Sequence, residues 1–148
     1  MKNLFFSLLY VLFAQFSFGQ EVNKLLSDYL QLKDALVVGD NAKATNATNT
    51  FYSDLKAQKT FKEKTSLLKL SEKMVASKSL DDKRKQFNTF SLEVWKLVKN
   101  ANSLKQTVYF DYCPMEQAYW LSTEAKIQNP YLGKEMLMCG DIVKTKQP

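Results

Sequence analysis

The distribution of glycine and proline constrains the fold of this chain more than any other feature. Between Asp40 and Cys113 the chain has neither a glycine nor a proline. The segment after Cys113 contains Pro114, Pro130, Gly133, Gly140 and Pro148. Glycine and proline disfavour the interior of a helix, whereas turns and loops need both. We therefore expect a helical body followed by an irregular C-terminal segment.

Apolar residues recur at helical spacing in four parts of the body. These patterns cover residues 22–36, 44–55, 61–75 and 87–98. Gly39 is suited to end the first helix and Asp40 to cap the second. Ser79 to Asp82 has the form of a capping box, which predicts the start of the fourth helix. Each helix has one apolar stripe to bury, so the helices should pack as a four-helix bundle.

The C-terminal segment contains two candidate strands. Residues 107–112 are β-branched and aromatic, which favours extended chain, and residues 141–143 form a second short candidate. Pairing of the two would make a short β-ribbon and bring Cys113 towards Cys139. The predicted fold class is mainly α, with a bundle and an irregular C-terminal segment that includes this ribbon.

The N-terminus has the layout of a secretory signal peptide. Lys2 precedes an apolar run, and Ser17 and Gly19 are small residues at the −3 and −1 positions of a cleavage after Gly19. The run is too short for a spanning helix, and no cysteine stands at the cleavage point to carry a lipid anchor. We expect residues 1–19 to be removed and residues 20–148 to form one periplasmic or secreted domain that does not span the membrane. Within it, residues 107–148 form a Cys/Met-rich cap.

Charge and composition exclude several functions. The chain has no histidine, which excludes imidazole-ligated metals and the usual base of a serine or cysteine nucleophile. We therefore expect no enzymatic activity. The formal net charge is +6, and many lysines fall in one helical region. In an exported protein without arginine clusters, this pattern indicates a solvated face rather than a nucleic-acid site.

Sulfur-containing residues concentrate in the last quarter of the chain. They are Cys113, Met115, Met136, Met138 and Cys139. In extended chain, Cys113 and Met115 would point the same way, and in a helical turn Met136 and Cys139 would share a face. Thiolates and thioethers are soft ligands that suit Cu(I). One hypothesis is therefore a site for Cu(I) or another soft metal.

A disulfide is the competing hypothesis. Two cysteines in an exported protein most often pair with each other. A Cys113–Cys139 bond would close a loop of about 27 residues and stabilise the fold by roughly 3.5 kcal/mol.

Aromatic residues, Trp120 and Tyr131 among them, surround the segment that contains the sulfurs. They would bury this segment and shield a reactive sulfur from solvent. Aromatic residues of this kind also serve as the apolar cap of a bundle.

Several motifs resemble a known family. They are LSDYLQLKDALVVGD at 26–40, RKQFNTFS at 84–91, VYFDYCPM at 108–115, YWLS at 119–122, IQNPYLGKEM at 127–136 and the final CG. They are similar to uncharacterised secreted bacterial domains, mainly from Bacteroidota, that have a YCPM…NPYxGxxM…CG signature. Those domains also occur fused to periplasmic adaptor subunits of heavy-metal efflux systems. The resemblance implies a role in metal handling in the cell envelope, with Cys113, Met115, Met136 and Cys139 matching the family's sulfur pattern.

Two functions follow from these observations. In the first, Cys113 and Cys139 are thiolate ligands and Met115 and Met136 thioether ligands of a soft ion. Met138 is an auxiliary ligand, and Trp120 and Tyr131 cap the pocket. Such a protein would buffer metal or deliver it to an efflux adaptor. In the second, the protein binds no metal, and a Cys113–Cys139 disulfide stabilises a module that docks on another envelope protein.

Overall fold

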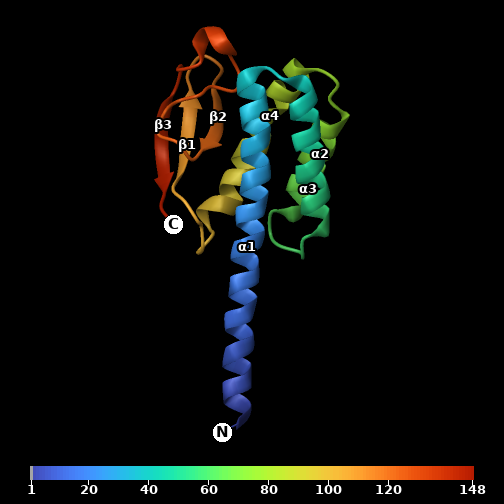
Figure 1. Ribbon diagram of the computed structural model, residues 1–148, viewed down its shortest axis with the longest axis vertical. Helices are drawn as coiled ribbons and strands as arrows, with labels where there is room; N and C mark the ends of the chain where they lie inside the picture. Colours follow the sequence, from blue (N-terminus) through green and yellow to red (C-terminus); the bar gives the residue numbers. More distant parts are fainter. Residues whose placement is uncertain (1) are drawn as a thin grey trace.

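The computed structural model describes the backbone of residues 2–148 and the side chains of residues 19–148. In chain order, the elements are α1 (Lys2–Val38), α2 (Asn41–Ala57), α3 (Lys64–Ala76), α4 (Leu80–Lys99), β1 (Val108–Cys113), β2 (Ala118–Ser122), the 3-10 helix η1 (Lys134–Met136) and β3 (Asp141–Lys146) (Figure 1). The predicted class, mainly α with a small β part at the C-terminus, is confirmed. Residues 1–18, the bulk of the predicted signal peptide, lie outside the described side chains.

The helix boundaries form at the predicted signals. Gly39, at φ +76°, ends α1, and the N–H groups of Gly39 and Asp40 donate to the carbonyls of Leu36 and Ala35. This is the Schellman pattern of a helix C-terminus. The Asp40 carboxylate then accepts the Lys43 N–H at 2.9 Å and caps α2. At the start of α4, the Ser79 hydroxyl accepts the N–H of Asp82 at 3.1 Å.

The apolar stripes of the helices meet in an aromatic core. Tyr29 of α1 stacks on Phe87 of α4 with ring centroids 5.2 Å apart. Phe51 of α2 packs edge-on against Phe90 at 4.8 Å. All four side chains are buried, as the helical periodicity predicted. Phe61 differs, since it lies in the turn before α3 rather than inside that helix.

The C-terminal segment forms an antiparallel sheet of three strands in the order β2-β1-β3. The predicted pairing of the first and last strand is confirmed, with Tyr112 opposite Asp141. The second strand in the chain, β2, was not predicted from the sequence. It is buried along most of its length, so its residues do not alternate between polar and apolar. The turn before it has its positive φ at Gln117, where the usual signal is glycine or asparagine.

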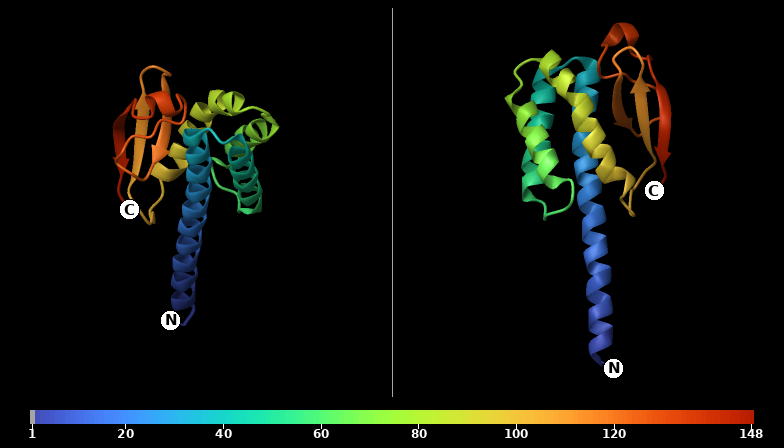
Figure 2. Two further views of the ribbon diagram at one scale, coloured as in Figure 1. Left: turned by 45° about the horizontal axis from the view of Figure 1, so that its top comes forward. Right: turned by 180° about the vertical axis from the view of Figure 1, so that it is seen from behind.

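The sheet is continuous with the helical core. Figures 1 and 2 show it on one side of α1 and α4, with α2 and α3 on the other side. The free edge of β2 faces the helices: the Tyr119 N–H donates to Asn88 Oδ1 at 2.9 Å, and the Leu121 N–H donates to the Tyr29 hydroxyl at 3.0 Å. Phe110 stacks on Trp95 of α4 at 4.6 Å. The sheet therefore has a fixed position on the bundle.

The opposite edge of the sheet is exposed but protected. β3 is largely solvent-exposed, and its pairing with β1 shifts by one residue between Phe110 and Asp111, which makes a bulge at Val143. Lys144 and Lys146 follow the bulge. Bulges and lysines on an edge strand oppose pairing with another chain.

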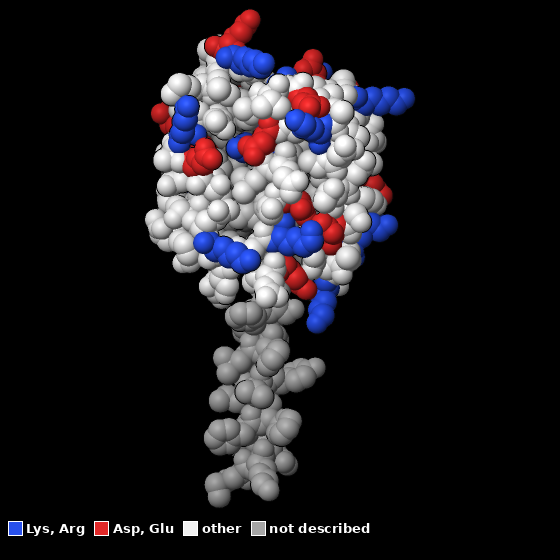
Figure 3. Space-filling model, viewed as in Figure 1, with Lys and Arg blue, Asp and Glu red and all other residues white. Residues whose placement is uncertain are grey.

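The surface carries mixed charge. On the face shown in Figure 3, lysine and arginine side chains are interspersed with aspartate and glutamate side chains. This is the pattern of a solvated surface. Within the described residues, none of the helices combines the length and the apolar composition that crossing a membrane requires.

Candidate functional site

The two cysteines come from different parts of the C-terminal segment. Cys113 is the last residue of β1 and is fully buried. Cys139 lies between η1 and β3, and its N–H donates to the Met136 carbonyl at 3.1 Å. Because Tyr112 pairs with Asp141, the end of β1 lies beside the start of β3. The strand pairing thus brings the two cysteines to the same end of the sheet.

The two thiols are in contact. The Sγ atoms of Cys113 and Cys139 are 3.6 Å apart, and both cysteines are free. The hydrogen bond to Cys113 and burial raise the pKa of the Cys139 thiol, and the negative charges of Asp141 and Glu116 act in the same direction. A raised pKa is the reverse of what a nucleophilic cysteine needs at neutral pH. The raised pKa is not that of a thiol activated for nucleophilic attack, and the sulfur contact places the two cysteines as a pair.

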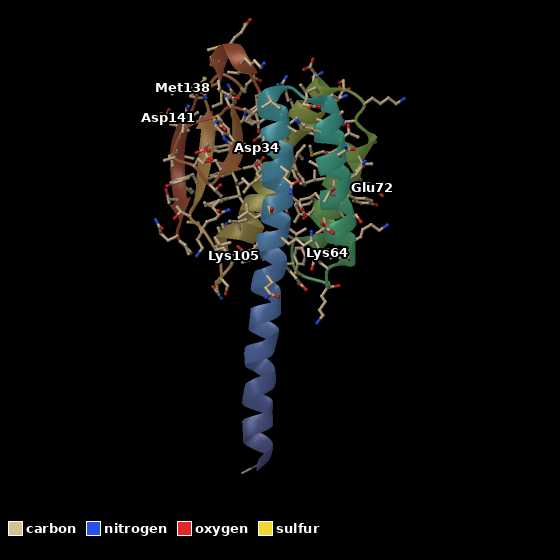
Figure 4. All side chains as sticks on the ribbon, viewed as in Figure 1. Asp34, Lys64, Glu72, Lys105, Met138 and Asp141 are labelled. Atoms are coloured by element: carbon tan, nitrogen blue, oxygen red, sulfur yellow. The ribbon has the colours of Figure 1, made fainter. Side chains whose placement is uncertain are left out.

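Three methionines lie in the segments next to the cysteine pair. Met115 is in the turn between β1 and β2, Met136 is the last residue of η1, and Met138 directly precedes Cys139. Their side chains are 61%, 41% and 68% exposed, respectively. Met115 is therefore not in extended chain as expected, because β1 ends at Cys113. The i, i+3 turn predicted for Met136 and Cys139 is present. Figure 4 shows Met138 and Asp141 at the upper end of the sheet, far from Lys105.

Trp120 and Tyr131, the predicted cap, lie beside the cysteine pair. Trp120 is fully buried and meets the ring of Tyr131 edge-on at 6.1 Å. The Trp120 indole also packs against Gly140, the residue after Cys139, so closely that a Cβ there would lie 2.6 Å from Trp120 Cη2. Gly140 has φ +141°, which glycine adopts readily. The indole therefore supports the backbone that carries Cys139.

Asn129 also belongs to this site, although sequence reasoning treated it only as part of a turn. It is fully buried, and its amide Nδ2 donates to the Cys139 carbonyl at 2.7 Å. Its Oδ1 accepts the N–H groups of Tyr131 and Leu132 at 2.8 and 3.2 Å. The Asn-Pro dipeptide was the available sequence signal, since asparagine side chains commonly bond the backbone two residues on.

Carboxylates play a different part near the site. Among the described side chains, no group of three or more His, Cys, Asp or Glu residues is placed to hold a metal ion. Asp111 of β1 is fully buried and accepts a hydrogen bond from the Ser122 hydroxyl at 2.7 Å. Burial raises the pKa of Asp111 to about 6. This carboxyl is bonded within the sheet.

Comparison with known proteins places the helical part of the chain in a family. A family model described as "Protein of unknown function (DUF3347)" matches residues 25–106, which is more than half of the chain. The match begins within α1, includes all of α2, α3 and α4, and ends just before β1. No curated protein matches, and no solved structure does.

Proposed function

The chain belongs to the DUF3347 family, whose function is unknown, and we propose that it is an exported protein that binds Cu(I) or a similar soft ion between Cys113 and Cys139. The observation that carries the proposal is the contact of two unbonded sulfurs from segments 26 positions apart in the sequence. Because the fold holds the two free thiols in contact, both sulfurs can bind the same ion. Cys113 comes from a strand of the sheet, so one ligand is rigidly placed.

The separation of the sulfurs suits a shared ion. Two ligands that each lie about 2.3 Å from one metal ion, as thiolates do around zinc, are 3.6 Å apart when they subtend about 103° at the ion. That angle is close to tetrahedral. An ion bound beside the line that joins the two sulfurs would therefore meet both thiolates at their present separation.

The chemistry of the surrounding donors favours a soft ion. The further donors next to the pair are the thioethers of Met115 and Met136, with Met138 as an auxiliary ligand. Methionine is unbranched and flexible, so an exposed thioether can turn towards a bound ion. Thioether and thiolate donors select Cu(I) over Ca²⁺ and Mg²⁺, which require oxygen ligands. In this proposal Trp120 and Tyr131 cover the inner side of the ion.

The cellular setting is part of the same proposal. The signal-peptide pattern of residues 1–19 supports export to the periplasm or the medium. The resemblance to domains fused to efflux adaptors supports an adaptor of that kind as the partner. The protein would buffer the ion or deliver it to efflux, with no catalytic role.

Competition for Cu(I) with a chromophoric chelator, on fully reduced protein, tests this function. We expect Cys113→Ser to abolish Cu(I) binding and Met136→Leu to weaken it, since each removes one of the four proposed ligands. Met74→Leu is the matched control, because Met74 is a buried residue of α3 and should bind as the wild type does. Equal Cu(I) affinity of wild type and Cys113→Ser would refute the proposal.

The second candidate is an interaction module without metal, stabilised by a Cys113–Cys139 disulfide. The sulfur contact of 3.6 Å favours it too, because thiols so close pair readily on oxidation. Non-reducing mass spectrometry of protein isolated from its native compartment separates the two functions. A fully oxidised pair, together with no Cu(I) binding after reduction, would favour the module.

A further inference from the structure

Asn129 links the loop that carries Cys139 to the turn before it. Its side chain forms three hydrogen bonds to backbone groups, to Cys139 on one side and to Tyr131 and Leu132 on the other. Its own N–H donates to the Leu137 carbonyl at 2.7 Å. An amide that is fully buried must be bonded in this way, since an unpaired buried polar group costs about 1–3 kcal/mol.

This link matters because Cys139 belongs to no regular element. Cys113 has the hydrogen bonds of β1 to hold it, whereas Cys139 lies in irregular chain between η1 and β3. Its carbonyl is held by the Asn129 amide and its N–H by the Met136 carbonyl. The Asn129 side chain therefore supplies the bond that ties the Cys139 peptide to a part of the chain outside its own turn.

We propose that Asn129 is the positioning residue of the cysteine pair: its amide holds the Cys139 backbone so that the thiol faces Cys113. The metal-affinity part of this inference rests on the proposed function. The thiol-pairing part does not, because two thiols can form a disulfide whether or not they bind a metal.

The chain contains a control at the opposite end of the sheet. The Asn23 amide Nδ2 donates to the Ser103 carbonyl at 2.6 Å, and its Oδ1 accepts the Lys105 N–H at 2.9 Å. Both bonds lie within the residues that remain after the predicted cleavage. Lys105 lies near the lower end of the sheet in Figure 4, away from Met138 and Asp141. Asn23 and Asn129 thus make the same kinds of bond, one far from the sulfurs and one beside them.

The test compares Asn129→Ser with Asn23→Ser. Serine can still accept a backbone N–H in a turn, but its shorter side chain cannot replace the amide donor. Each purified variant is equilibrated in glutathione buffers, where Cys113 and Cys139 lose two protons and two electrons to glutathione disulfide, which becomes two glutathione molecules. For Asn129→Ser we expect the equilibrium constant of disulfide formation to fall about tenfold, which makes the reduction potential about 30 mV less negative. Cu(I) affinity should fall about 10–100-fold.

The outcomes separate this inference from the proposed function. Asn23→Ser should lower the melting temperature and leave the potential and Cu(I) affinity unchanged. An unchanged potential in Asn129→Ser, or an equal shift in Asn23→Ser, would overturn the positioning role. Absence of Cu(I) binding in the wild type would refute the proposed function but leave the potential comparison valid. If Asn129→Ser does not fold, Asn129→Asp, which retains the Oδ1 acceptors and loses the Nδ2 donor, gives the same readout.

Discussion

Replacing Gly140 with alanine should destabilise the protein by about 4 kcal/mol, through both backbone strain and steric conflict. The added Cβ would lie 2.6 Å from Trp120 Cη2 and 2.9 Å from the Tyr112 carbonyl oxygen. Neither neighbour can easily move, because the oxygen belongs to the backbone of β1 and the Trp120 ring is fully buried. Overpacking of this kind costs about 1–3 kcal/mol. The positive φ of +141° adds strain of similar size.

Gly133→Ala separates the two contributions. Gly133 also has a positive φ, +68°, but the nearest atom to its added Cβ would be the Arg84 Nη2 at 4.0 Å. Alanine there should cost only the strain, about 2 kcal/mol. The difference between the two variants, about 2 kcal/mol, then measures the steric conflict with Trp120 and the Tyr112 carbonyl. We expect this difference to appear as a lower urea midpoint for Gly140→Ala than for Gly133→Ala, with an unchanged denaturant slope. Equal midpoints would refute the close packing of Trp120 on Gly140.

Three further predictions concern stability. Tyr29→Phe should lower the free energy of unfolding in urea by about 2 kcal/mol. The substitution leaves the buried Leu121 N–H without its acceptor and Ser91 without its 2.7 Å partner. A loss below about 0.5 kcal/mol would contradict this. Burial raises the pKa of Asp111 from 3.8 to about 6, so the folded state binds more protons than the unfolded state between these values. Stability should therefore fall as the pH rises from about 4 to about 6, and Asp111→Asn should flatten the profile measured by thermal unfolding across that range. Ser79→Ala should cost about 1 kcal/mol, seen as a lower melting temperature, since it removes the cap of α4.

The helical part of the fold was predictable from local patterns. Gly39, Asp40 and Ser79 act at helix ends as their side chains and backbone preferences dictate. These preferences involve residues three to five positions apart, so the sequence contains the whole interaction. The apolar stripes likewise identified Phe51, Phe87 and Phe90 as core residues.

Strand β2 could not be predicted from local sequence patterns. Its residues are buried by contacts with α4 and by the ring of Tyr131, which packs against Trp120. A strand that is buried on both faces has no alternation to recognise. Its hydrogen bonds to Tyr29 and Asn88 join residues far apart in the chain, and no spacing rule relates them.

The candidate site was likewise predictable only in part from the sequence. Residue types and spacing predicted that sulfur donors would gather in the C-terminal segment, and that pairing of two candidate strands would bring Cys113 towards Cys139. The 3.6 Å contact of the two thiols, the exposure of Met115 and the link from Asn129 to Cys139 are visible only in the folded structure. Local signals specify which element a residue joins, because they depend on neighbours along the chain. The distance between two sulfurs depends on strand register, on a bulge and on the packing of Trp120 against Gly140, which arise only when distant segments meet.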